Sequence, residues 1–119
     1  FDPALLNFAA SSEGEGRVTV IRRFFVEAVV RSLRFRDHRP MIFISDIRTS
    51  SDSMKDFDSV ERCVEQDMTR QRAWVEELRP DLSMLKFRLP WGPGETRYLR
   101  GRLLVQAFPP CTSTETRLV

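Results

Sequence analysis

The chain of 119 residues has few of the residue types that build metal and redox sites. It contains a single histidine, His38, and two cysteines, Cys63 and Cys111, which lie far apart in the sequence. This set lacks the closely spaced ligands of a structural zinc site and forms no disulfide framework. We therefore expect no metal centre, and the sparse cysteines favour a reducing, cytoplasmic compartment.

Long apolar runs are also absent, and so is the pattern of a secretory signal peptide. No stretch approaches the ~20 apolar residues that a helix needs to cross a bilayer, so we expect no membrane span. Hydrophobic residues make up 41% and charged residues 30% of the chain, which is typical of one globular domain. Because the chain begins with Phe1 and ends in an apolar run, we interpret it as a piece of a longer protein.

Lysine is scarce, since Lys55 and Lys86 are the only two lysines among 19 basic residues. Arginine matches lysine for solubility and phosphate binding, but it does not lose its proton near neutral pH. Lys86 lies in the apolar run of residues 82–90, where a deprotonable amine has a chemical use. The ordinary alternative is a surface lysine on the polar face of a strand.

Charge is unevenly distributed along the chain, although the net charge is only +2. Residues 17–39 hold seven arginines against two acids, and residues 79–102 hold six basic residues against two acids. Residues 52–67 have the opposite balance, six acids against two basic residues. The basic segments suit contact with an anionic polymer, although charge runs are more often solvated surface.

The hydrophobic pattern predicts alternating strands and helices. We expect strands at residues 17–25, 41–45, 82–89 and 114–119, helices at 26–36 and from Asp56 or Asp58 to Pro80, and an antiparallel hairpin from 97–99 and 103–107. The continuous apolar run at 41–45 is typical of a strand buried on both faces. Together these elements predict an α/β fold with a mostly parallel sheet and an antiparallel edge.

Three charged residues lie in or directly after the predicted strands. Functional residues of open α/β sheets gather just beyond the carboxyl ends of the parallel strands. Asp46 follows residues 41–45, Lys86 lies in the next strand, and Glu115 lies in the last one. We expect them to converge on one rim, although an N-cap or a surface ion pair is the ordinary role of either acid. Carboxylates favour the charged amine and burial favours the neutral one, so such a lysine can orient a hydroxyl and accept its proton.

Three motifs occur in order: Phe43-Ile-Ser-Asp-Ile-Arg48, Leu85-Lys-Phe-Arg-Leu-Pro-Trp91 and Gln106-Ala-Phe-Pro-Pro-Cys-Thr-Ser-Thr-Glu-Thr-Arg-Leu118. With them the chain resembles, over essentially its whole length, the poxvirus-type cap-specific mRNA 2′-O-methyltransferases. Members of this family double as regulatory (processivity) subunits of poly(A) polymerase, with relatives in large DNA viruses. The resemblance implies a Rossmann-like methyltransferase domain that uses S-adenosylmethionine. Its N-terminal part is missing, so that residues 1–119 form its C-terminal portion.

The resemblance also implies roles for individual residues. The family methylates the ribose of the first transcribed nucleotide with a Lys-Asp-Lys-Glu tetrad, and Asp46, Lys86 and Glu115 match its last three members. Lys86 would be the general base or the amine that orients the hydroxyl. Phe25 and Ile47 would contact the methyl donor beside Asp46, although both suit an ordinary core role. The first lysine and the Gly-rich donor loop would lie upstream, so we expect little or no activity from this chain alone.

A second group of residues would hold the capped RNA. Trp91 matches an aromatic residue that stacks on 7-methylguanine, where a cation–π term of about 0.5–2 kcal/mol is available. The family has an acidic residue two positions further on, where this chain has Pro93, and Glu95 is the nearest substitute. Arg48 and Arg88 would bind the RNA backbone, which fixes register without reading sequence.

We therefore predict 2′-O-methylation of capped mRNA by the parent protein, in the cytoplasm, or in the viral factory or virion if the source is a virus. One alternative is a non-catalytic, RNA-binding processivity subunit of a poly(A) polymerase. Another is a methyltransferase that acts on uncapped RNA. Asp46, Lys86 and Glu115 favour the enzyme, whereas Pro93 favours the processivity subunit.

Overall fold

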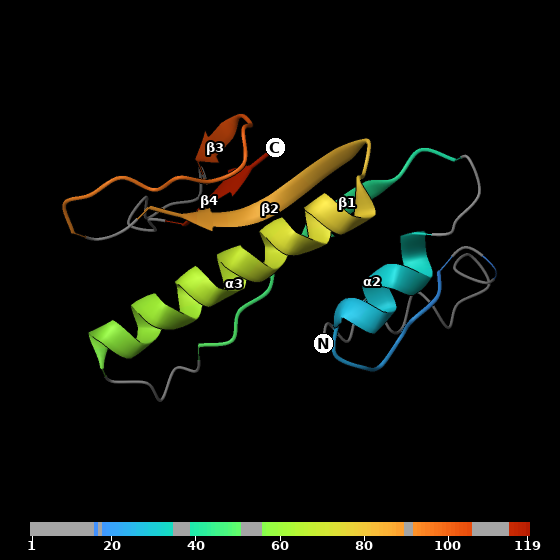
Figure 1. Ribbon diagram of the computed structural model, residues 1–119, viewed down its shortest axis with the longest axis horizontal. Helices are drawn as coiled ribbons and strands as arrows, with labels where there is room; N and C mark the ends of the chain where they lie inside the picture. Colours follow the sequence, from blue (N-terminus) through green and yellow to red (C-terminus); the bar gives the residue numbers. More distant parts are fainter. Residues whose placement is uncertain (1–15, 17, 35–38, 51–55, 90–91, 106–114) are drawn as a thin grey trace.

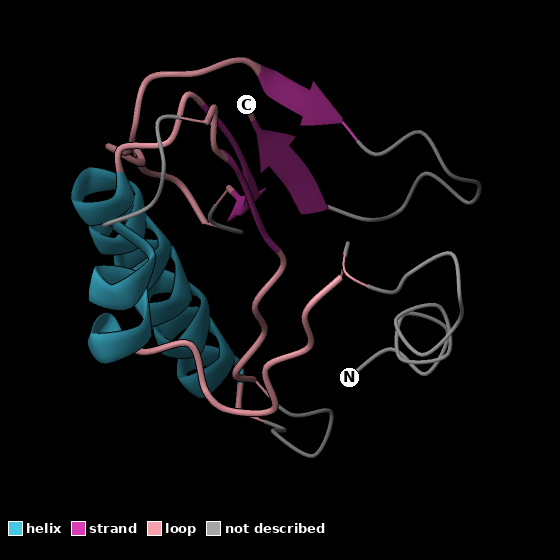
Figure 2. Cartoon of the chain, turned by 90° about the vertical axis from the view of Figure 1, so that its right-hand side faces the viewer, coloured by secondary structure: helices cyan, strands magenta, loops and turns pink. Residues whose placement is uncertain are grey.

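The structure, a computed structural model, describes residues 16, 18–34, 39–50, 56–89, 92–105 and 115–119. These residues form, in order, α2 (Glu27–Arg34), β1 (Ile42–Ser45), α3 (Phe57–Leu78), β2 (Leu82–Arg88), β3 (Leu103–Val105) and β4 (Glu115–Leu118). The result is a small α/β arrangement in which the helices lie on one side of the sheet (Figures 1 and 2). Over the described ranges, neither helix is long and apolar enough to cross a membrane.

Helix α3 is the longest element, and local sequence explains both of its ends. Asp56 is the N-cap, and its carboxylate accepts a hydrogen bond from the Ser59 amide at 3.1 Å. Hydrogen bonds from Ser59, above all from its hydroxyl, lower the pKa of Asp56. The helix ends where Arg79, with φ of 47°, donates its N–H to the Val75 carbonyl at 2.9 Å, and Pro80 stops a further turn. Its buried residues are Asp67, Met68, Gln71, Trp74 and Leu78.

The four-stranded sheet is mixed, with strand order β1-β2-β4-β3. β1 and β2 are parallel and end their pairing at Ser45 and Leu85, whereas β4 is antiparallel to both β2 and β3. One of the three strand pairings is parallel and two are antiparallel, so the sheet is mixed, whereas the sequence predicts a mostly parallel one. The predicted antiparallel edge is present, because β3 lies at the edge of the sheet and pairs antiparallel with β4. β4 takes the inner place between β2 and β3 because Thr116 and Leu118 are buried, whereas β3 is exposed throughout.

Two apolar clusters lie along α3. The cluster that joins α2 to the C-terminal end of α3 is made of Val30, Trp74 and Leu78, with Phe25, Leu33, Met41, Phe43 and Ile47 packed against them. The cluster between the middle of α3 and the sheet is made of Met68, Phe87 and Leu118, with Val64, Tyr98 and Leu99. We call them the Trp74 cluster and the Phe87 cluster. Together they hold the helices against one face of the sheet.

Residues 18–25 form no strand, contrary to the prediction for residues 17–25, of which Arg17 lies outside the described residues. The Arg23 amide donates to the Ile21 carbonyl at 3.0 Å, and the chain bends there. This bend precedes Phe25, whose ring meets Trp74 edge-on at 4.9 Å. Packing of Phe25 into the core therefore overrides the β propensity of the segment. The predicted helix that follows is confirmed as α2.

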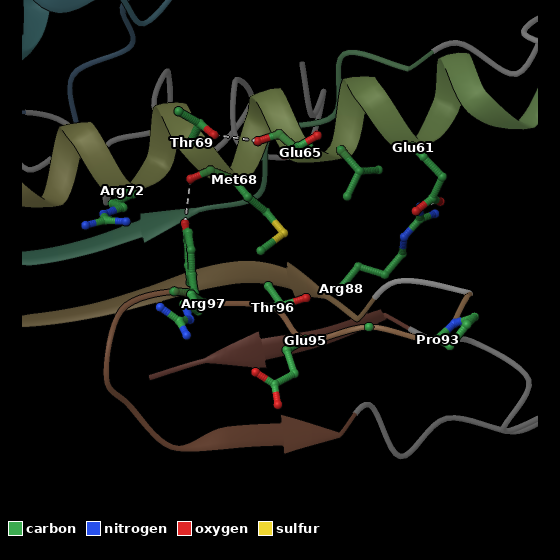
Figure 3. Close-up of a pocket in the computed structure, with 13 residues that line it drawn as sticks. Glu61, Glu65, Met68, Thr69, Arg72, Arg88, Pro93, Glu95, Thr96 and Arg97 are labelled. Carbon is green, nitrogen blue, oxygen red and sulfur yellow. Dashed lines mark hydrogen bonds and ion pairs between the residues drawn. The ribbon is translucent and has the colours of Figure 1, made fainter.

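The predicted hairpin of residues 97–99 with 103–107 is also wrong, because β3 pairs with β4 instead. Tyr98 and Leu99 pack against the Phe87 cluster, and the Tyr98 hydroxyl donates to the Met68 carbonyl at 2.7 Å (Figure 3). Burial raises the pKa of Tyr98 to about 12, which keeps the hydroxyl a donor. The segment is thereby attached to α3 rather than to a neighbouring strand.

The apolar run of β1 predicts burial on both faces, but β1 is buried on one face only. Ile42 and Ile44 are 66% and 62% exposed, whereas Phe43 packs against the Trp74 cluster and Ser45 is buried. The cause is the position of β1 at the edge of the sheet, with described helices on one face alone. The predicted strands at 82–89 and 114–119 are confirmed as β2 and β4, and the long helix as α3.

Candidate functional site

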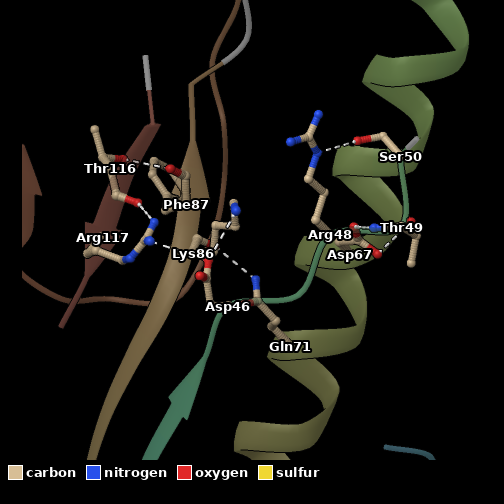
Figure 4. A network of polar contacts seen from close by, with 10 residues as sticks. All are labelled: Asp46, Arg48, Thr49, Ser50, Asp67, Gln71, Lys86, Phe87, Thr116 and Arg117. Atoms are coloured by element: carbon tan, nitrogen blue, oxygen red, sulfur yellow. Dashed lines mark hydrogen bonds and ion pairs between the residues drawn. The ribbon is translucent and has the colours of Figure 1, made fainter. Parts of the chain in front are cut away.

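Asp46 and Lys86 lie side by side at the end of the parallel strand pair. Asp46 follows the last residue of β1, and Lys86 lies one position beyond the register pair of Ser45 with Leu85. The Lys86 Nζ atom is 3.1 Å from Asp46 Oδ1 (Figure 4). The lysine side chain is 23% exposed and the aspartate side chain 61%. The structure therefore brings together the acid and the amine that the strand order led us to associate.

Arg117 is a third member of this group. It lies opposite Lys86 in the antiparallel register of β2 with β4, and its guanidinium is 3.3 Å from the same Asp46 oxygen. Sequence reasoning missed it. The available signal is the alternation in β4, where Arg117 stands between the buried Thr116 and Leu118. Two cations thus share one exposed carboxylate, an arrangement that also suits a bound anion.

Glu115 is described for its backbone only. It begins β4 and lies opposite Arg88 in the register, two positions from Arg117. Residues two apart on a strand share a face of the sheet, so the Glu115 position lies on the Lys86 face, within diagonal reach of long side chains. Its part in the site stays a prediction.

Two buried polar side chains of α3 form hydrogen bonds with the segments that carry Asp46 and Lys86. Asp67 accepts two hydrogen bonds of 2.9 Å from Thr49, one from its backbone N–H and one from its hydroxyl. The Gln71 amide donates to the Lys86 carbonyl at 2.9 Å. Asp67 and Gln71 are 7% and 1% exposed. Sequence reasoning missed them too, although two polar residues on the buried face of an apolar helix are a detectable signal.

The predicted donor residues Phe25 and Ile47 belong to the Trp74 cluster. The Phe25 ring contacts Trp74 and stacks on Phe43 at 5.9 Å, and Ile47 packs against the same cluster. Both residues are half-buried, which matches their ordinary core role, and Ile47 directly follows Asp46 in the chain. Arg48 is exposed, and its Nε donates to Ser50 Oγ at 3.4 Å.

The predicted RNA-binding residues Arg88 and Glu95 line a pocket between α3 and residues 93–98, with a cavity volume of about 490 Å³ (Figure 3). Arg88 forms an ion pair with Glu61 of α3, and burial lowers its pKa. Its Nε atom is buried without a hydrogen-bond partner among the described residues. Glu95 is exposed. Trp91, the predicted stacking residue, lies outside the described residues.

A family model described as "Poly A polymerase regulatory subunit" matches residues 8–119. The chain belongs to this family. No match is found among curated proteins or among solved structures. The suspected relationship is therefore confirmed at the level of the family.

Basic side chains of this regulatory-subunit family member fall into two groups. Among the arginines whose side chains the structure describes, all are exposed except Arg88 and Arg117. These two are 19% and 25% exposed and lie on either side of Lys86 in the paired strands β2 and β4. Half-buried cations are costly unless an anion compensates them, and here Glu61 compensates Arg88 while Asp46 compensates Arg117, so an anion bound at this end of the sheet would compete with these carboxylates.

Proposed function

We propose that the chain belongs to an RNA-binding processivity subunit of a poly(A) polymerase. The family match over residues 8–119 is the observation that carries the proposal. Two features of the described surface support it. Lys86, Arg88 and Arg117 form a half-buried basic cluster on β2 and β4, and Arg97, Arg100 and Arg102 are exposed on the segment that leads into β3.

Such a distribution suits a single-stranded polymer of uniform sequence. Contacts between arginine and phosphate provide affinity without base discrimination, and they weaken as salt is added because bound counterions are released. A processivity subunit needs this kind of contact, since the RNA must move along it as the tail grows. The half-buried cluster would hold one or two phosphates firmly, and the exposed arginines would guide the rest of the strand.

The test is tail extension by the polymerase catalytic subunit with and without the full-length protein, with excess competitor RNA added after initiation. We expect longer tails in its presence, and shorter ones when Arg97 and Arg100 are both changed to glutamine. The salt dependence of RNA binding should fall by about one phosphate contact per arginine removed. Arg62→Gln is the matched control, because Arg62 already pairs with Asp56 at 3.8 Å. Tail lengths that do not respond to the full-length protein would overturn the proposal.

Methyl transfer is the second candidate, and the contact of Lys86 with Asp46 favours it. β1, α3 and β2 form a parallel βαβ unit, and the pair lies where such units place functional residues. We propose a Rossmann-like methyltransferase domain to which preceding residues contribute further strands. Pure RNA binding explains the charge of Lys86, but it does not explain why a lysine stands where arginine serves almost everywhere else.

The residues beside Asp46 fit one part of a methyl donor. S-adenosylmethionine, when bound, supplies an electrophilic methyl group on a positively charged sulfur. The exposed Asp46 carboxylate suits a neighbouring cation, and the half-buried Phe25 and Ile47 suit the apolar face of an adenine. Lys86 would orient the ribose 2′-hydroxyl and accept its proton, with Glu115 as a predicted further partner.

Lys86→Arg in the full-length protein separates the two functions, because arginine keeps the positive charge but does not give up its proton. We expect methyl label to pass from S-adenosylmethionine to capped RNA, and the variant to lose at least about 100-fold of this rate. RNA affinity and tail length should stay unchanged. Transfer to uncapped RNA at the same rate would exclude cap recognition by the pocket of Arg88 and Glu95. No label from the unmodified protein, with RNA binding intact, would overturn methyl transfer and leave the processivity proposal standing.

A further inference from the structure

The contact of Asp46 with Lys86 needs an explanation, because the sheet does not fix it. Pairing of β1 with β2 ends at Ser45 and Leu85, so no strand register holds the chain of Asp46 beyond that point, whereas Lys86 stays paired with Arg117 of β4. Asp46 is 61% exposed and is free of the packing that holds a core residue in one rotamer. Some other part of the structure must hold the backbone on the Asp46 side of the ion pair, and any support of the Lys86 side adds to its pairing with β4.

Helix α3 provides such a support for the loop that follows Asp46. Thr49, three residues along, donates its N–H and its hydroxyl to the two oxygens of Asp67 (Figure 4). Arg70 adds a third contact to Asp67, at 3.3 Å. A carboxylate that is 7% exposed is costly to bury, and these donors offset the cost. The loop after β1 is thereby attached at a defined point of the helix.

The same helix supports the strand that carries Lys86. Gln71 lies one turn after Asp67, on the same face of α3, and its amide donates to the Lys86 carbonyl. Gln71 is 1% exposed, and its Oε1 atom has no hydrogen-bond partner within the described residues. An apolar residue would suit this place better if packing were the sole requirement. We attribute the presence of a glutamine here to its hydrogen bond with the Lys86 carbonyl.

We propose that Asp67 and Gln71 are positioning residues that together hold Asp46 and Lys86 in contact. Asp67 acts through Thr49 on the loop of Asp46, and Gln71 acts through the backbone of Lys86. Because both residues lie on one turn of a rigid helix, the separation of the acid and the amine is set by the helix. The kinetic consequence rests on the proposed methyl transfer, but the geometric claim does not.

The test uses the full-length protein and the reactivity of its amines. Thr49→Val removes the hydroxyl bond to Asp67, and Gln71→Met removes the amide bond to Lys86, with little change in side-chain volume. Limited acylation followed by mass spectrometry gives the modification of Lys86 relative to Lys55, the only other lysine of this chain. We expect the ratio to rise about twofold to tenfold in each variant, the factor that corresponds to one hydrogen bond, because Asp46 then holds the Lys86 amine less closely.

Two further variants separate positioning from loss of stability. Thr49→Ser keeps the hydroxyl and should restore the original ratio. Thr69→Val removes a hydroxyl bond of similar length within α3, from Thr69 to the Glu65 carbonyl at 2.8 Å, and should leave the ratio unchanged. An unchanged ratio in both Thr49→Val and Gln71→Met would overturn the proposal. An equal rise in Thr69→Val would overturn it as well, since any damage to α3 would then suffice.

If the full-length protein transfers methyl groups, kcat should fall by a similar factor in Thr49→Val and Gln71→Met while KM for the RNA stays the same. A fall in binding with kcat preserved would contradict a positioning role. If the protein transfers no methyl group, the amine ratio alone decides the geometric claim. These outcomes distinguish a failure of the proposed methyl transfer from a failure of the positioning role of Asp67 and Gln71.

Discussion

The layer between α3 and the sheet differs in composition between the C-terminal end of the helix and its middle. At the C-terminal end of the helix, Trp74 and Leu78 meet α2, Phe25 and Phe43 in an entirely apolar cluster. In the middle of the helix, the buried polar residues of the described structure gather around Asp46 and Lys86. They are Ser45, Asp67, Gln71 and Thr116.

The difference shows which end supplies stability and which end is adapted to a site. Three buried polar atoms, Ser45 Oγ, Gln71 Oε1 and Arg88 Nε, have no hydrogen-bond partner among the described residues, and they belong to β1, α3 and β2. Each such atom costs about 1–3 kcal/mol relative to a bonded one. Proteins retain local costs of this kind mainly where function requires them. The comparison therefore singles out the end of the sheet around Lys86 independently of any motif.

The apolar end should be the more sensitive to truncation. Trp74→Ala removes a side chain that is 6% exposed and contacts both α2 and Phe25. We expect a loss of about 3–5 kcal/mol in the free energy of unfolding, measured by urea denaturation. Trp74→Phe, which keeps most of the apolar contact, should cost clearly less. Equal losses in the two variants would contradict a packing role.

The polar end should respond to the loss of a bonded hydroxyl. Thr116 donates to the Phe87 carbonyl at 2.8 Å and is buried. Thr116→Val keeps the shape but leaves that carbonyl without this donor, so we expect a loss of about 1–2 kcal/mol in the same measurement. No loss would mean that water or another donor replaces the hydroxyl.

An unbonded hydroxyl at the same end should behave in the opposite way. Ser45 is 5% exposed, and its Oγ has no partner in the described part of the chain. Ser45→Ala should therefore raise the free energy of unfolding by about 0.5–1 kcal/mol. A decrease would show that the Ser45 hydroxyl is bonded in solution, and the contrast between the two ends would then be weaker.

An effect confined to high pH is expected at Tyr98, the only tyrosine of the chain. Burial raises its pKa from 10.0 to about 12. The stability that it contributes is fully present below pH 10 and is lost as the pH rises through about 12, because the unfolded chain ionises first. Between these pH values, the free energy of unfolding should fall with rising pH in the unmodified protein. In Tyr98→Phe it should change much less over the same range. The phenolate absorbance reports Tyr98 alone, so a transition near pH 10 in the folded protein would contradict its burial.

Much of the fold could be predicted from local pattern, and the errors have a common cause. The run at 41–45, the caps of α3 and the strand at 82–89 carry their signals within a few residues. The segments 18–25 and 97–99 also look like strands, but Phe25 and Tyr98 form contacts with α3 that no local window contains. Tertiary contacts of this kind decide between strand and loop, and they involve residues more than 25 positions apart.

The residues of the candidate site also divide into those that could be predicted from the sequence and those that could not. Asp46 and Lys86 could be associated because Asp46 follows one parallel strand and Lys86 lies late in the next, and functional residues of open α/β sheets gather near the carboxyl ends of such strands. Arg117 could not, because its place opposite Lys86 depends on the insertion of β4 next to β2. Gln71 and Asp67 could have been noticed as polar residues on an apolar helix face, but their partners follow only from how the helix lies on the sheet.

The position of β4 has a consequence for biosynthesis. β3 leaves the ribosome before β4, yet β4 is the strand with which it pairs, and β4 in turn separates it from β2. As residues 103–105 emerge, the βαβ unit is already complete, but the third parallel strand has no place to add. Closure of the sheet must wait until residues 115–118 are released, and it then forms two ladders at once. Lys86 and Arg117 can therefore come together only after residues 115–118 have been synthesised and have paired with β2.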